Sequence, residues 1–361
     1  MREFGASKKA KKQPQVKARL PIVHLIDGNN WVNRAYYATP VLHTSDGIPT
    51  NGVKGFINMV NGLYNLIQSK KQVPYIVICF DIPRKETFRY DVFTQWAKEE
   101  PELVEALFPK KEERSYKGNR KVSEHTYEDL HEQIEICKTL CKIAGFTVLD
   151  GRKINQPVEA DDIIGTLAWR LKGCLRMIHS RDKDFKQLLT KHHIRLWQPE
   201  QQNSPAKLYT KNNMYGQDGL HPHQYVDYLI MDGDKVDNIA GIPGCGATTA
   251  IKLLDRWGSL DNIIEKHGRI TGHPDRKVAL TAAGVPQPVK IVNEKGKKVD
   301  HPTLKEPVPC PNFEVSRKLA KIKTDVKNVP LSLSKLKMGK PDNEALKRWK
   351  EDLEFNQLFW V

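Results

Sequence analysis

Short apolar runs alternate with longer segments of helical periodicity along the first 220 residues, and this alternation limits the fold more than any other feature. The runs have the length and composition of buried strands, and they lie at 22–26, 75–80, 146–149, 175–179 and 193–197. Between them, segments such as 53–67 and 127–144 repeat apolar residues on one helix face. Strands that alternate with helices predict an α/β domain with a central, mainly parallel sheet flanked by helices.

Three parts follow one another along the chain. Residues 1–20 form a basic segment without an apolar stretch, which predicts a disordered arm. The α/β core is expected to occupy 21–219, and residues 220–361 are expected to be mostly helical. Within the last part, 282–311 is rich in Pro, Gly and Lys, which predicts a basic loop or a small hairpin.

The charge balance indicates a polyanionic partner. The chain carries 58 Lys and Arg against 43 Asp and Glu, a net charge of +15. Nucleic acid is the first candidate partner for such a chain, and an ordinary basic protein is the alternative. No apolar run approaches the length of a membrane span, and we see no signal peptide ahead of the first strand. We therefore expect a cytoplasmic protein without a membrane partner.

Acidic residues gather where this fold would place the carboxyl ends of its strands. Asp27 directly follows the first apolar run, and Asp81 directly follows the second. Because the carboxyl ends of parallel strands share one edge of a sheet, where ligands bind, we expect such side chains to meet there. The complete predicted cluster is Asp27, Asp81, Glu159, Asp161, Asp162, Asp182, Asp184, Asp234 and Asp237.

Nine carboxylates in one crevice would repel one another, so such a site is stable only with bound cations. All-oxygen ligands select Mg²⁺ or Mn²⁺ over zinc. Two such ions about 3.5–4 Å apart stabilise the attacking and leaving oxygens of phosphoryl transfer. Taken one at a time, each acid is explained more simply as a helix cap or a turn residue; the whole set is not.

Six segments together resemble the 5′ nucleases, a family that includes bacteriophage 5′→3′ exonucleases, the N-terminal nuclease domain of bacterial DNA polymerases, and flap endonucleases. The segments occur in family order and read HLIDGNNWVNRAYY, FDIPRKETFRY, YKGNR, VEADDIIG, SRDKDFKQLL and GDKVDNIAGIPGCGATTAIKLL. The resemblance implies a structure-dependent nuclease that hydrolyses DNA from 5′ ends or at flaps with two Mg²⁺ or Mn²⁺ ions. Its products would carry 5′-phosphates.

The resemblance also implies separate roles for the acids. The more catalytic metal cluster would consist of Asp27, Asp81, Glu159 and Asp161. Asp162, Asp182 and Asp184 would link the two clusters. Asp234 and Asp237 would hold the second ion, partly through water.

Lys117 and Arg120 match a Lys and an Arg that the family carries in a helical arch over the site. There they would draw the scissile phosphate onto the metals and offset charge in the transition state. An ordinary solvated surface is the alternative for these two residues. The arch insertion 89–125 is longer here than in the family, and it is predicted to enlarge the arch or to form a lid.

DNA contacts are predicted outside the acidic cluster as well. Arg34 matches a phosphate-binding Arg of the family, and Arg89 is a second candidate. The stretch GIPGCG resembles the family's helix–hairpin–helix, whose N–H groups face a phosphate and which often holds K⁺. Its predicted contact residues are Gly241, Ile242, Gly244 and Gly246. A plain glycine-rich turn is the alternative.

Two other functions fit parts of the pattern. One is a protein of the same fold that binds DNA structures without cutting them, although all nine matched acids are present. The other is an RNase of the PIN type, although such domains are smaller and lack the GIPGCG element. We expect a monomer that acts in replication, primer removal or DNA degradation. Its expected substrates are duplexes with a 5′ end, nick, gap or flap, and RNA–DNA hybrids are a further possible substrate. If a phage encodes the protein, it would work in the cytoplasm of the host.

Overall fold

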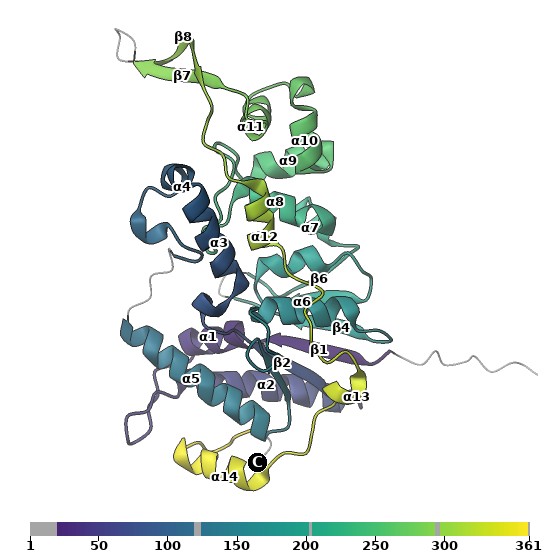
Figure 1. The fold of residues 1–361 in the computed structure, drawn as a ribbon. Helices are drawn as coiled ribbons and strands as arrows, with labels where there is room; N and C mark the ends of the chain where they lie inside the picture. Colours follow the sequence, from purple (N-terminus) through teal and green to yellow (C-terminus); the bar gives the residue numbers. More distant parts are fainter. Residues whose placement is uncertain (1–19, 119–123, 202–203, 293–296, 360–361) are drawn as a thin grey trace, which may run out of the picture.

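A six-stranded sheet forms the centre of the molecule in the computed structural model, which describes residues 20–118, 124–201, 204–292 and 297–359 (Figure 1). The strands are β1 (Ile22–Asp27), β2 (Tyr75–Phe80), β3 (Thr147–Asp150), β4 (Leu175–His179), β5 (Ile194–Gln198) and β6 (Lys207–Thr210). Their order is β3-β2-β1-β4-β5-β6, with β6 alone antiparallel to its neighbour. The predicted α/β fold with a mainly parallel sheet is confirmed. The edge strand β6 was not predicted, because its sequence KLYT contains no apolar run.

The strand order determines where a ligand can bind. The chain passes from β1 to β2 and β3, and then crosses through α6 (Ala160–Arg170) to β4 on the other side of β1. In open parallel sheets such a reversal leaves a crevice at the carboxyl ends of the strands beside it. These strands are β1 and β4, so the acids that follow them lie at the crevice.

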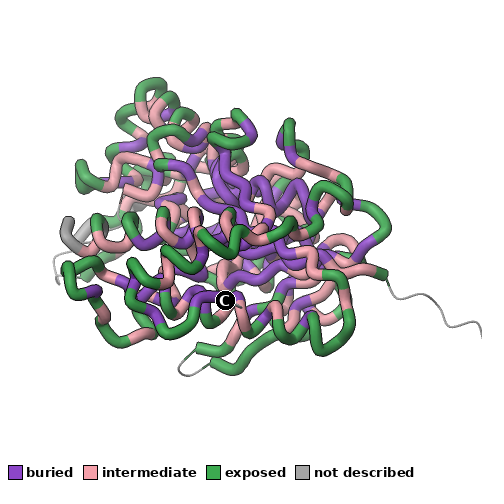
Figure 2. Tube along the Cα trace, turned by 90° about the horizontal axis from the view of Figure 1, so that it is seen from below, coloured by how far each residue is buried: buried purple, intermediate pink, exposed green. Residues whose placement is uncertain are grey.

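Helices cover both faces of the sheet, and the strands therefore point alternate residues into two apolar clusters. On β1, Val23 and Leu25 join the cluster that contains the apolar face of α6, whereas Ile26 joins the opposite cluster. That opposite cluster is covered by α1 (Gly28–Ala38), α2 (Asn51–Ser69) and α5 (Glu124–Ile143). Figure 2 shows the buried residues concentrated between the two exposed outer layers. Such burial on both faces explains the continuous apolar runs of the strands.

The segment that follows β2 packs into the molecule. Its helices are α3 (Phe88–Glu99) and α4 (Pro101–Leu107). Phe93, Trp96 and Phe108 form a buried aromatic cluster with ring centroids 5.4–6.3 Å apart, and α3 packs against α12 (Phe313–Ala320). The predicted lid is therefore wrong for these helices, because their apolar faces belong to the core. Residues 119–123, which would complete an arch, lie outside the described residues, as does most of the predicted N-terminal arm.

The part after residue 220 is mostly helical, and it does not stay together as one region (Figure 1). Its helices are α8 (Tyr225–Asp232), α9 (Ala247–Trp257), α10 (Leu260–Glu265), α11 (Asp275–Ala282), α12, α13 (Leu333–Leu336) and α14 (Asn343–Asp352). The predicted loop or hairpin at 282–311 contains two antiparallel strands, β7 (Gln287–Val292) and β8 (Lys298–Glu306). After the hairpin the chain returns to the α/β core, where Leu346 and Phe359 join the cluster under α5.

The remaining elements are short. They are α7 (Met214–Asp218), η1 (Arg84–Glu86), η2 (Lys111–Glu113), η3 (Lys183–Leu188), η4 (Pro222–Gln224) and η5 (His267–Arg269), the last five of which are 3₁₀ turns. In the part of the chain that the structure describes, no helix combines the length and the apolar character that crossing a bilayer requires.

Candidate active site

Asp27 and Asp81 stand at the carboxyl ends of the neighbouring strands β1 and β2 and mark one rim of the sheet. Asp27 is the last residue of β1 and caps α1, since its Oδ1 accepts a hydrogen bond from the Asn30 N–H (3.0 Å). Its Oδ2 accepts a second one from the Ser180 hydroxyl (2.9 Å). Asp81 follows β2, and its Oδ1 accepts from the Ala160 N–H at the start of α6 (2.9 Å). The parallel sheet thus brings the predicted acids of both strands to one edge.

The 3₁₀ turn η3 carries the acids that follow β4. Asp182 Oδ1 accepts a hydrogen bond from the Asp184 N–H (2.8 Å), and the Asp182 N–H donates to the Ser180 hydroxyl (3.0 Å). Ser180 therefore connects this turn with Asp27 on the neighbouring strand. Asp184 Oδ1 is buried and has no hydrogen-bond partner among the described residues. A buried carboxylate oxygen in this state is unfavourable unless a cation binds it.

Asp162 is completely buried and has a different function from the one predicted. Its two oxygens accept from the two terminal nitrogens of Arg89 at 2.6 and 2.9 Å, and also from the N–H groups of Lys323 (2.8 Å) and Glu159 (3.3 Å). Because four donors already engage this carboxylate, the predicted metal-ligand role of Asp162 is corrected. Asp162 caps α6 and neutralises Arg89. A helix cap was the alternative explanation for each acid taken singly.

Arg89 cannot make the DNA contact predicted for it. Only 3% of this residue is exposed. Its guanidinium also donates to Glu159 Oε2 (2.9 Å) and to the backbone carbonyls of Leu319 and Lys321. The Arg89 side chain therefore joins α3, α6 and the segment after α12 inside the protein. A charge-pair network of this kind is common in interiors because a lone buried charge is very costly.

Lys117 reaches the site from a turn. Its Nζ lies 2.6 Å from Glu159 Oε1 and 3.8 Å from Asp237 Oδ1. Its φ of 54° places it in the left-handed region, and Arg84 Nη1 donates to its carbonyl (2.8 Å). Lys117 itself is therefore not in a helix. Arg120 lies outside the described residues.

Tyr116 was not predicted, although it stands in one of the quoted segments. Its buried hydroxyl bridges Glu159 Oε2 (3.1 Å) and Asp237 Oδ2 (3.3 Å). Lys183 was missed as well, and its Nζ lies 2.8 Å from Asp234 Oδ2. The sequence carries one signal for these contacts: Tyr116 is adjacent to the predicted Lys117, and Lys183 lies between the predicted Asp182 and Asp184.

The carboxyl groups at the rim interact strongly with one another. Burial, together with the charges of Asp81 and Asp182, raises the pKa of Asp27 to about 7. Burial and the charges of Asp182, Asp27 and Asp81 raise the pKa of Asp161 well above its ordinary value. The pKa values of Asp182 and Asp184 are also raised, mainly by burial. Acids from three strands and one helix therefore share a single electrostatic site.

Glu159 shows the opposite behaviour. Burial alone would raise its pKa, but the charges of Lys117 and Arg89 lower it to about 2. Both oxygens of Glu159 are engaged by donors, Oε1 by Lys117 and Oε2 by Arg89 and Tyr116. Glu159 is thus ionised and compensated by the protein itself.

The donor set suits a divalent cation, although the described side chains do not form a finished site. No three Asp, Glu, His or Cys residues in the described ranges converge closely enough to hold a metal ion as they stand. The unpartnered Asp184 Oδ1 and the raised pKa values of Asp27 and Asp161 nevertheless indicate carboxylates that lack positive charge. Carboxylate oxygens are the ligands that Mg²⁺ and Mn²⁺ prefer. The residues therefore fit the predicted ions.

The GIPGCG stretch forms a tight turn between α8 and α9. Gly241 packs so closely that an added Cβ would lie 2.5 Å from the Asp232 carbonyl oxygen, and Gly244 has a φ of +79°. Gly246 is exposed at the start of α9, where no side chain caps the free N–H groups. Ile242 is 2% exposed and its N–H donates to the Met231 carbonyl, so this N–H is not free to make the phosphate contact predicted for Ile242.

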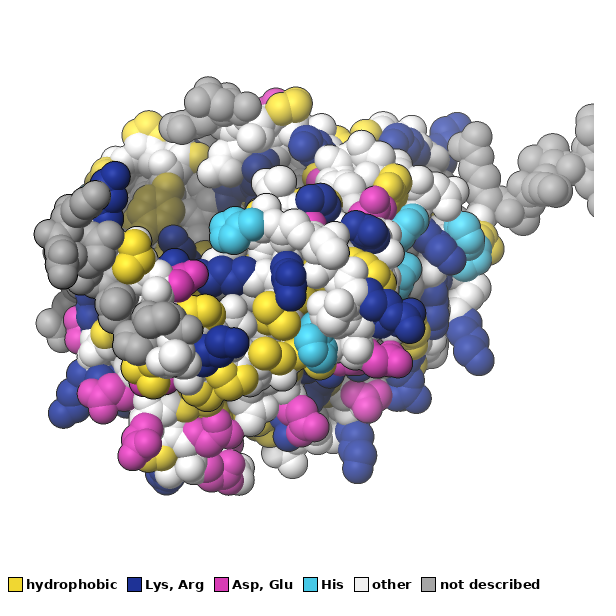
Figure 3. Space-filling model, turned by 90° about the horizontal axis from the view of Figure 1, so that it is seen from above, with side chains coloured by type: hydrophobic (Ala, Val, Ile, Leu, Met, Phe, Trp, Pro, Cys, Tyr) yellow, Lys and Arg dark blue, Asp and Glu magenta, His cyan; other side chains and the backbone are white. Residues whose placement is uncertain are grey.

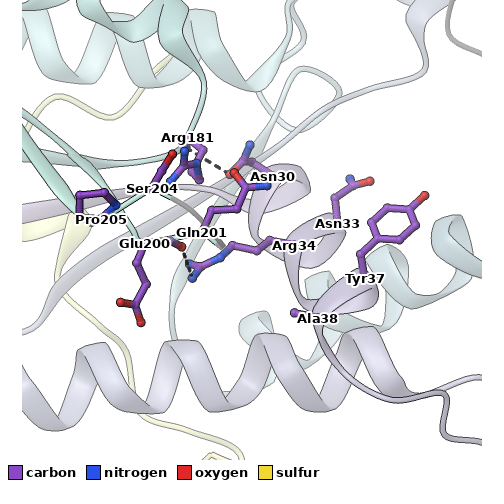
Figure 4. A pocket seen from close by; sticks show the side chains of 10 residues that line it. All are labelled: Asn30, Asn33, Arg34, Tyr37, Ala38, Arg181, Glu200, Gln201, Ser204 and Pro205. Carbon is purple, nitrogen blue, oxygen red and sulfur yellow. Dashed lines mark hydrogen bonds between the residues drawn. The ribbon is translucent and has the colours of Figure 1, made fainter.

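Arg34 lies on α1 at the wall of a cavity of about 920 Å³ (Figure 4). The cavity lies between α1 and the loop that follows β5, and it is also lined by Arg181 and Asn30. On the outside of the molecule, Figure 3 shows Lys and Arg side chains spread over the face seen from above. Arg34 and Arg181 thus place basic side chains beside the acidic rim.

Comparison with known proteins decides the family. Residues 22–219 match the model of the 5′–3′ exonuclease N-terminal resolvase-like domain, and residues 220–344 match that of the 5′–3′ exonuclease C-terminal SAM fold. The chain belongs to the 5′–3′ exonuclease family. The predicted 5′ nuclease resemblance is confirmed, and the protein is a nuclease.

Relatives of the 5′–3′ exonuclease family include enzymes with and without a polymerase. A 5′–3′ exonuclease of Aquifex aeolicus is 31% identical over 338 residues, which are 93% of each chain. The DNA polymerase I of Bacillus caldotenax is 32% identical over 250 residues, which are 69% of this chain and 25% of the polymerase. This protein therefore spans only a quarter of the polymerase relative that it matches.

Solved structures show the same fold at low sequence identity. The phage T5 D15 protein, crystallised with metal ions, has a TM-score of 0.51 at 17% identity and covers 73% of this chain and 85% of its own. Human GEN1 in complex with Holliday junction DNA has a TM-score of 0.53 at 12% identity, and the match covers 93% of this chain and 70% of the GEN1 chain. These likenesses establish the fold alone.

Proposed function

We propose that this protein is a structure-dependent 5′ nuclease that hydrolyses DNA phosphodiesters from 5′ ends or at flaps and leaves 5′-phosphates. One observation supports it most strongly. Asp27, Asp161 and Asp182 come from different elements, and the charge of Asp182 raises the pKa of both Asp27 and Asp161, in a chain of net charge +15. Clustered carboxylates can bind divalent cations, and the positive charge of the rest of the protein favours binding of a polyanionic substrate such as DNA.

The metal-holding groups in this proposal are the carboxylates at the sheet rim. Asp27, Asp81 and Asp161 would hold one Mg²⁺ or Mn²⁺, and Asp182, Asp184 and Asp237 would hold the other, with Asp234 positioning Lys183 beside it. When bound, the ions neutralise charge on the attacking and leaving oxygens. Water adds to phosphorus, the P–O3′ bond breaks, and the products are a 5′-phosphate and a 3′-hydroxyl.

Lys117 and Tyr116 position the phosphate in this proposal. The Lys117 ammonium lies 2.6 Å from Glu159, at the centre of the site, and is the nearest cation to the entering substrate. A phosphate oxygen would compete with Glu159 for this ammonium, and Glu159 Oε1 would then be available to hold a metal ion. The Tyr116 hydroxyl keeps Glu159 and Asp237 in place meanwhile. Charge on the non-bridging oxygens is thus balanced by a group already within the site.

The turn at Gly241–Gly246 is proposed to bind a phosphate of duplex DNA through the free N–H groups at the start of α9. A K⁺ ion at this turn is part of the proposal. Replacing KCl by choline chloride at equal ionic strength should weaken duplex binding if K⁺ contributes, whereas an unchanged dissociation constant would remove K⁺ from the proposal. The protein is proposed to act as a monomer on DNA in the cytoplasm.

A panel of labelled substrates tests the function. Flapped, nicked, gapped, blunt and RNA-primed duplexes are incubated with the protein in Mg²⁺, Mn²⁺ or EDTA. We expect metal-dependent cleavage that requires a 5′ end or flap. Tight DNA binding without cleavage in any metal would favour the non-cleaving alternative, and preferred cleavage of RNA would favour the PIN-type RNase.

A further inference from the structure

The cavity beside the carboxylate rim contains two arginines whose charges are not used by the fold. Arg34 Nη2 donates to the Glu200 carbonyl (3.0 Å), and Arg181 Nη1 donates to the Pro199 carbonyl. Neither guanidinium forms an ion pair with any carboxylate in the described ranges. In Figure 4 a dashed line joins the Arg34 guanidinium to Glu200, and Arg181 lines the same cavity.

Both guanidiniums line the same cavity, and their charges act on each other. Burial and the charge of Arg181 both lower the pKa of Arg34, while the Glu200 carboxylate partly offsets them. In Figure 4 the Glu200 side chain extends away from Arg181, so it leaves the Arg181 charge without a counter-ion. Two adjacent cations repel each other unless an anion lies between them.

The cavity adjoins the proposed catalytic rim directly. Arg181 immediately precedes Asp182, and its N–H donates to Asn30 Oδ1 (3.4 Å). The N–H of Asn30 in turn donates to Asp27 Oδ1 (3.0 Å). An anion held by the arginines would therefore lie a short distance along the strand from a bond at the carboxylates.

We propose that this cavity receives the 5′-terminal phosphate monoester of the strand to be cut, held between Arg34 and Arg181. A monoester carries a charge of about −1.5 to −2 at neutral pH, whereas an internal phosphodiester carries one negative charge. Two guanidiniums match the monoester in charge, and each can bind phosphate oxygens in a bidentate manner. A volume of about 920 Å³ is large enough for a terminal nucleotide. The inference rests on the proposed nuclease function and adds the chemistry of the strand end.

Two blunt duplexes that differ only in a 5′-phosphate or a 5′-hydroxyl test this inference. Their dissociation constants are measured in EDTA, and their single-turnover cleavage rates in Mg²⁺. We expect the phosphorylated duplex to bind about tenfold more tightly, the equivalent of about 1.4 kcal/mol, and to be cut faster. Arg181→Gln and Arg34→Gln should remove the difference. Arg348→Gln, an exposed arginine on α14, should preserve it.

Equal binding and equal cleavage of the two duplexes by the unaltered protein would overturn the inference, and so would a preference that survives Arg181→Gln. Arg181→Lys, which keeps the charge but not the bidentate geometry, should retain part of the preference. Thermal melting of each variant establishes that it is folded. If neither duplex is cut in any metal, the nuclease proposal fails, while the binding constants in EDTA still decide whether the cavity recognises the phosphate.

Discussion

Two halves of the acidic site carry their charge in opposite ways. In the open half, which we define as Asp27, Asp161, Asp182 and Asp184, burial and mutual repulsion raise every pKa. In the paired half, defined as Glu159, Asp162, Asp234 and Asp237, each acid lies within 4.0 Å of a Lys or Arg nitrogen. The fold thus supplies its own cations to one half and leaves the other half to cations from solution.

The difference separates carboxylates whose charge the protein already balances from carboxylates whose charge it leaves unbalanced. A carboxylate that is paired within the protein gains less from a metal ion, whereas an uncompensated carboxylate gains most from one. Asp161 and Asp162 are neighbours on α6, yet they belong to different halves. Position in the sequence alone therefore does not tell a ligand from a counter-ion.

The strongest test of this comparison replaces each of the two neighbouring acids, Asp161 and Asp162, by Asn in a separate variant. Asp161→Asn should lower the single-turnover cleavage rate by about 10³-fold, or ~4 kcal/mol, because it removes a metal ligand. DNA binding in EDTA should change little. Asp162→Asn is the matched control, and it should keep the cleavage rate within about tenfold while lowering the unfolding free energy. A reversal of these two outcomes would break the distinction between the halves.

Removal of Arg89, the buried cation of the paired half, should lower the free energy of unfolding. Arg89→Met leaves Glu159 and Asp162 without their shared counter-ion in the interior. We expect the unfolding free energy to fall by about 3–5 kcal/mol, as measured by urea denaturation. Arg152→Met is a suitable comparison, since its ion pair with Glu86 is exposed, and it should lower the unfolding free energy far less than Arg89→Met does. Equal losses would show that burial of the network contributes nothing.

Lys117→Ala tests whether the paired half takes part in the reaction. The cleavage rate should fall by about 10–100-fold, because the cation nearest to the phosphate is lost, while the DNA dissociation constant rises by less than about threefold. Lys110→Ala changes an exposed lysine of the same segment and should leave both quantities unchanged. A loss confined to binding would contradict the positioning role.

The smallest expected effect concerns pH in EDTA. The pKa of Asp27 is about 7 in the folded protein and near 3.8 in the unfolded chain, so only the folded state holds this proton between about pH 4 and 7. The unfolding free energy should therefore fall as the pH rises through this window, by at most about 1.4 kcal/mol per pH unit. Glu159, with a pKa lowered to about 2, acts in the other direction and loses its contribution only below about pH 4.5.

Urea denaturation at pH 5 and pH 8 measures this dependence. Asp27→Asn should flatten it, and Mg²⁺ should stabilise the protein more at pH 8 than at pH 5, because metal ligands must be deprotonated. A stability that rises between pH 5 and pH 8 in EDTA and is unaffected by Asp27→Asn would contradict the raised pKa of the open half.

Much of the fold follows from local sequence patterns. The apolar runs predicted five strands within one residue at either end, and the helical stripes predicted α2 and α5. The position of an acid directly after a strand was enough to place Asp27 and Asp81 at the rim. The same rule would also nominate Asp150 after β3, but its carboxylate is paired with Lys138 at 2.5 Å. A strand-end position is therefore not sufficient to place an acid in the site.

Sequence by itself determined the parallel sheet, the edge at which the acids meet and the family, since periodicity and strand ends are properties of neighbouring residues. Only the tertiary structure decided which acids are compensated. Arg89 reaches Glu159 and Asp162 across 70 and 73 residues, and Arg34 and Arg181 meet from α1 and the end of β4. The physical reason is that a carboxylate's charge state depends on burial and on cations within a few ångströms, and packing brings those cations from distant parts of the chain.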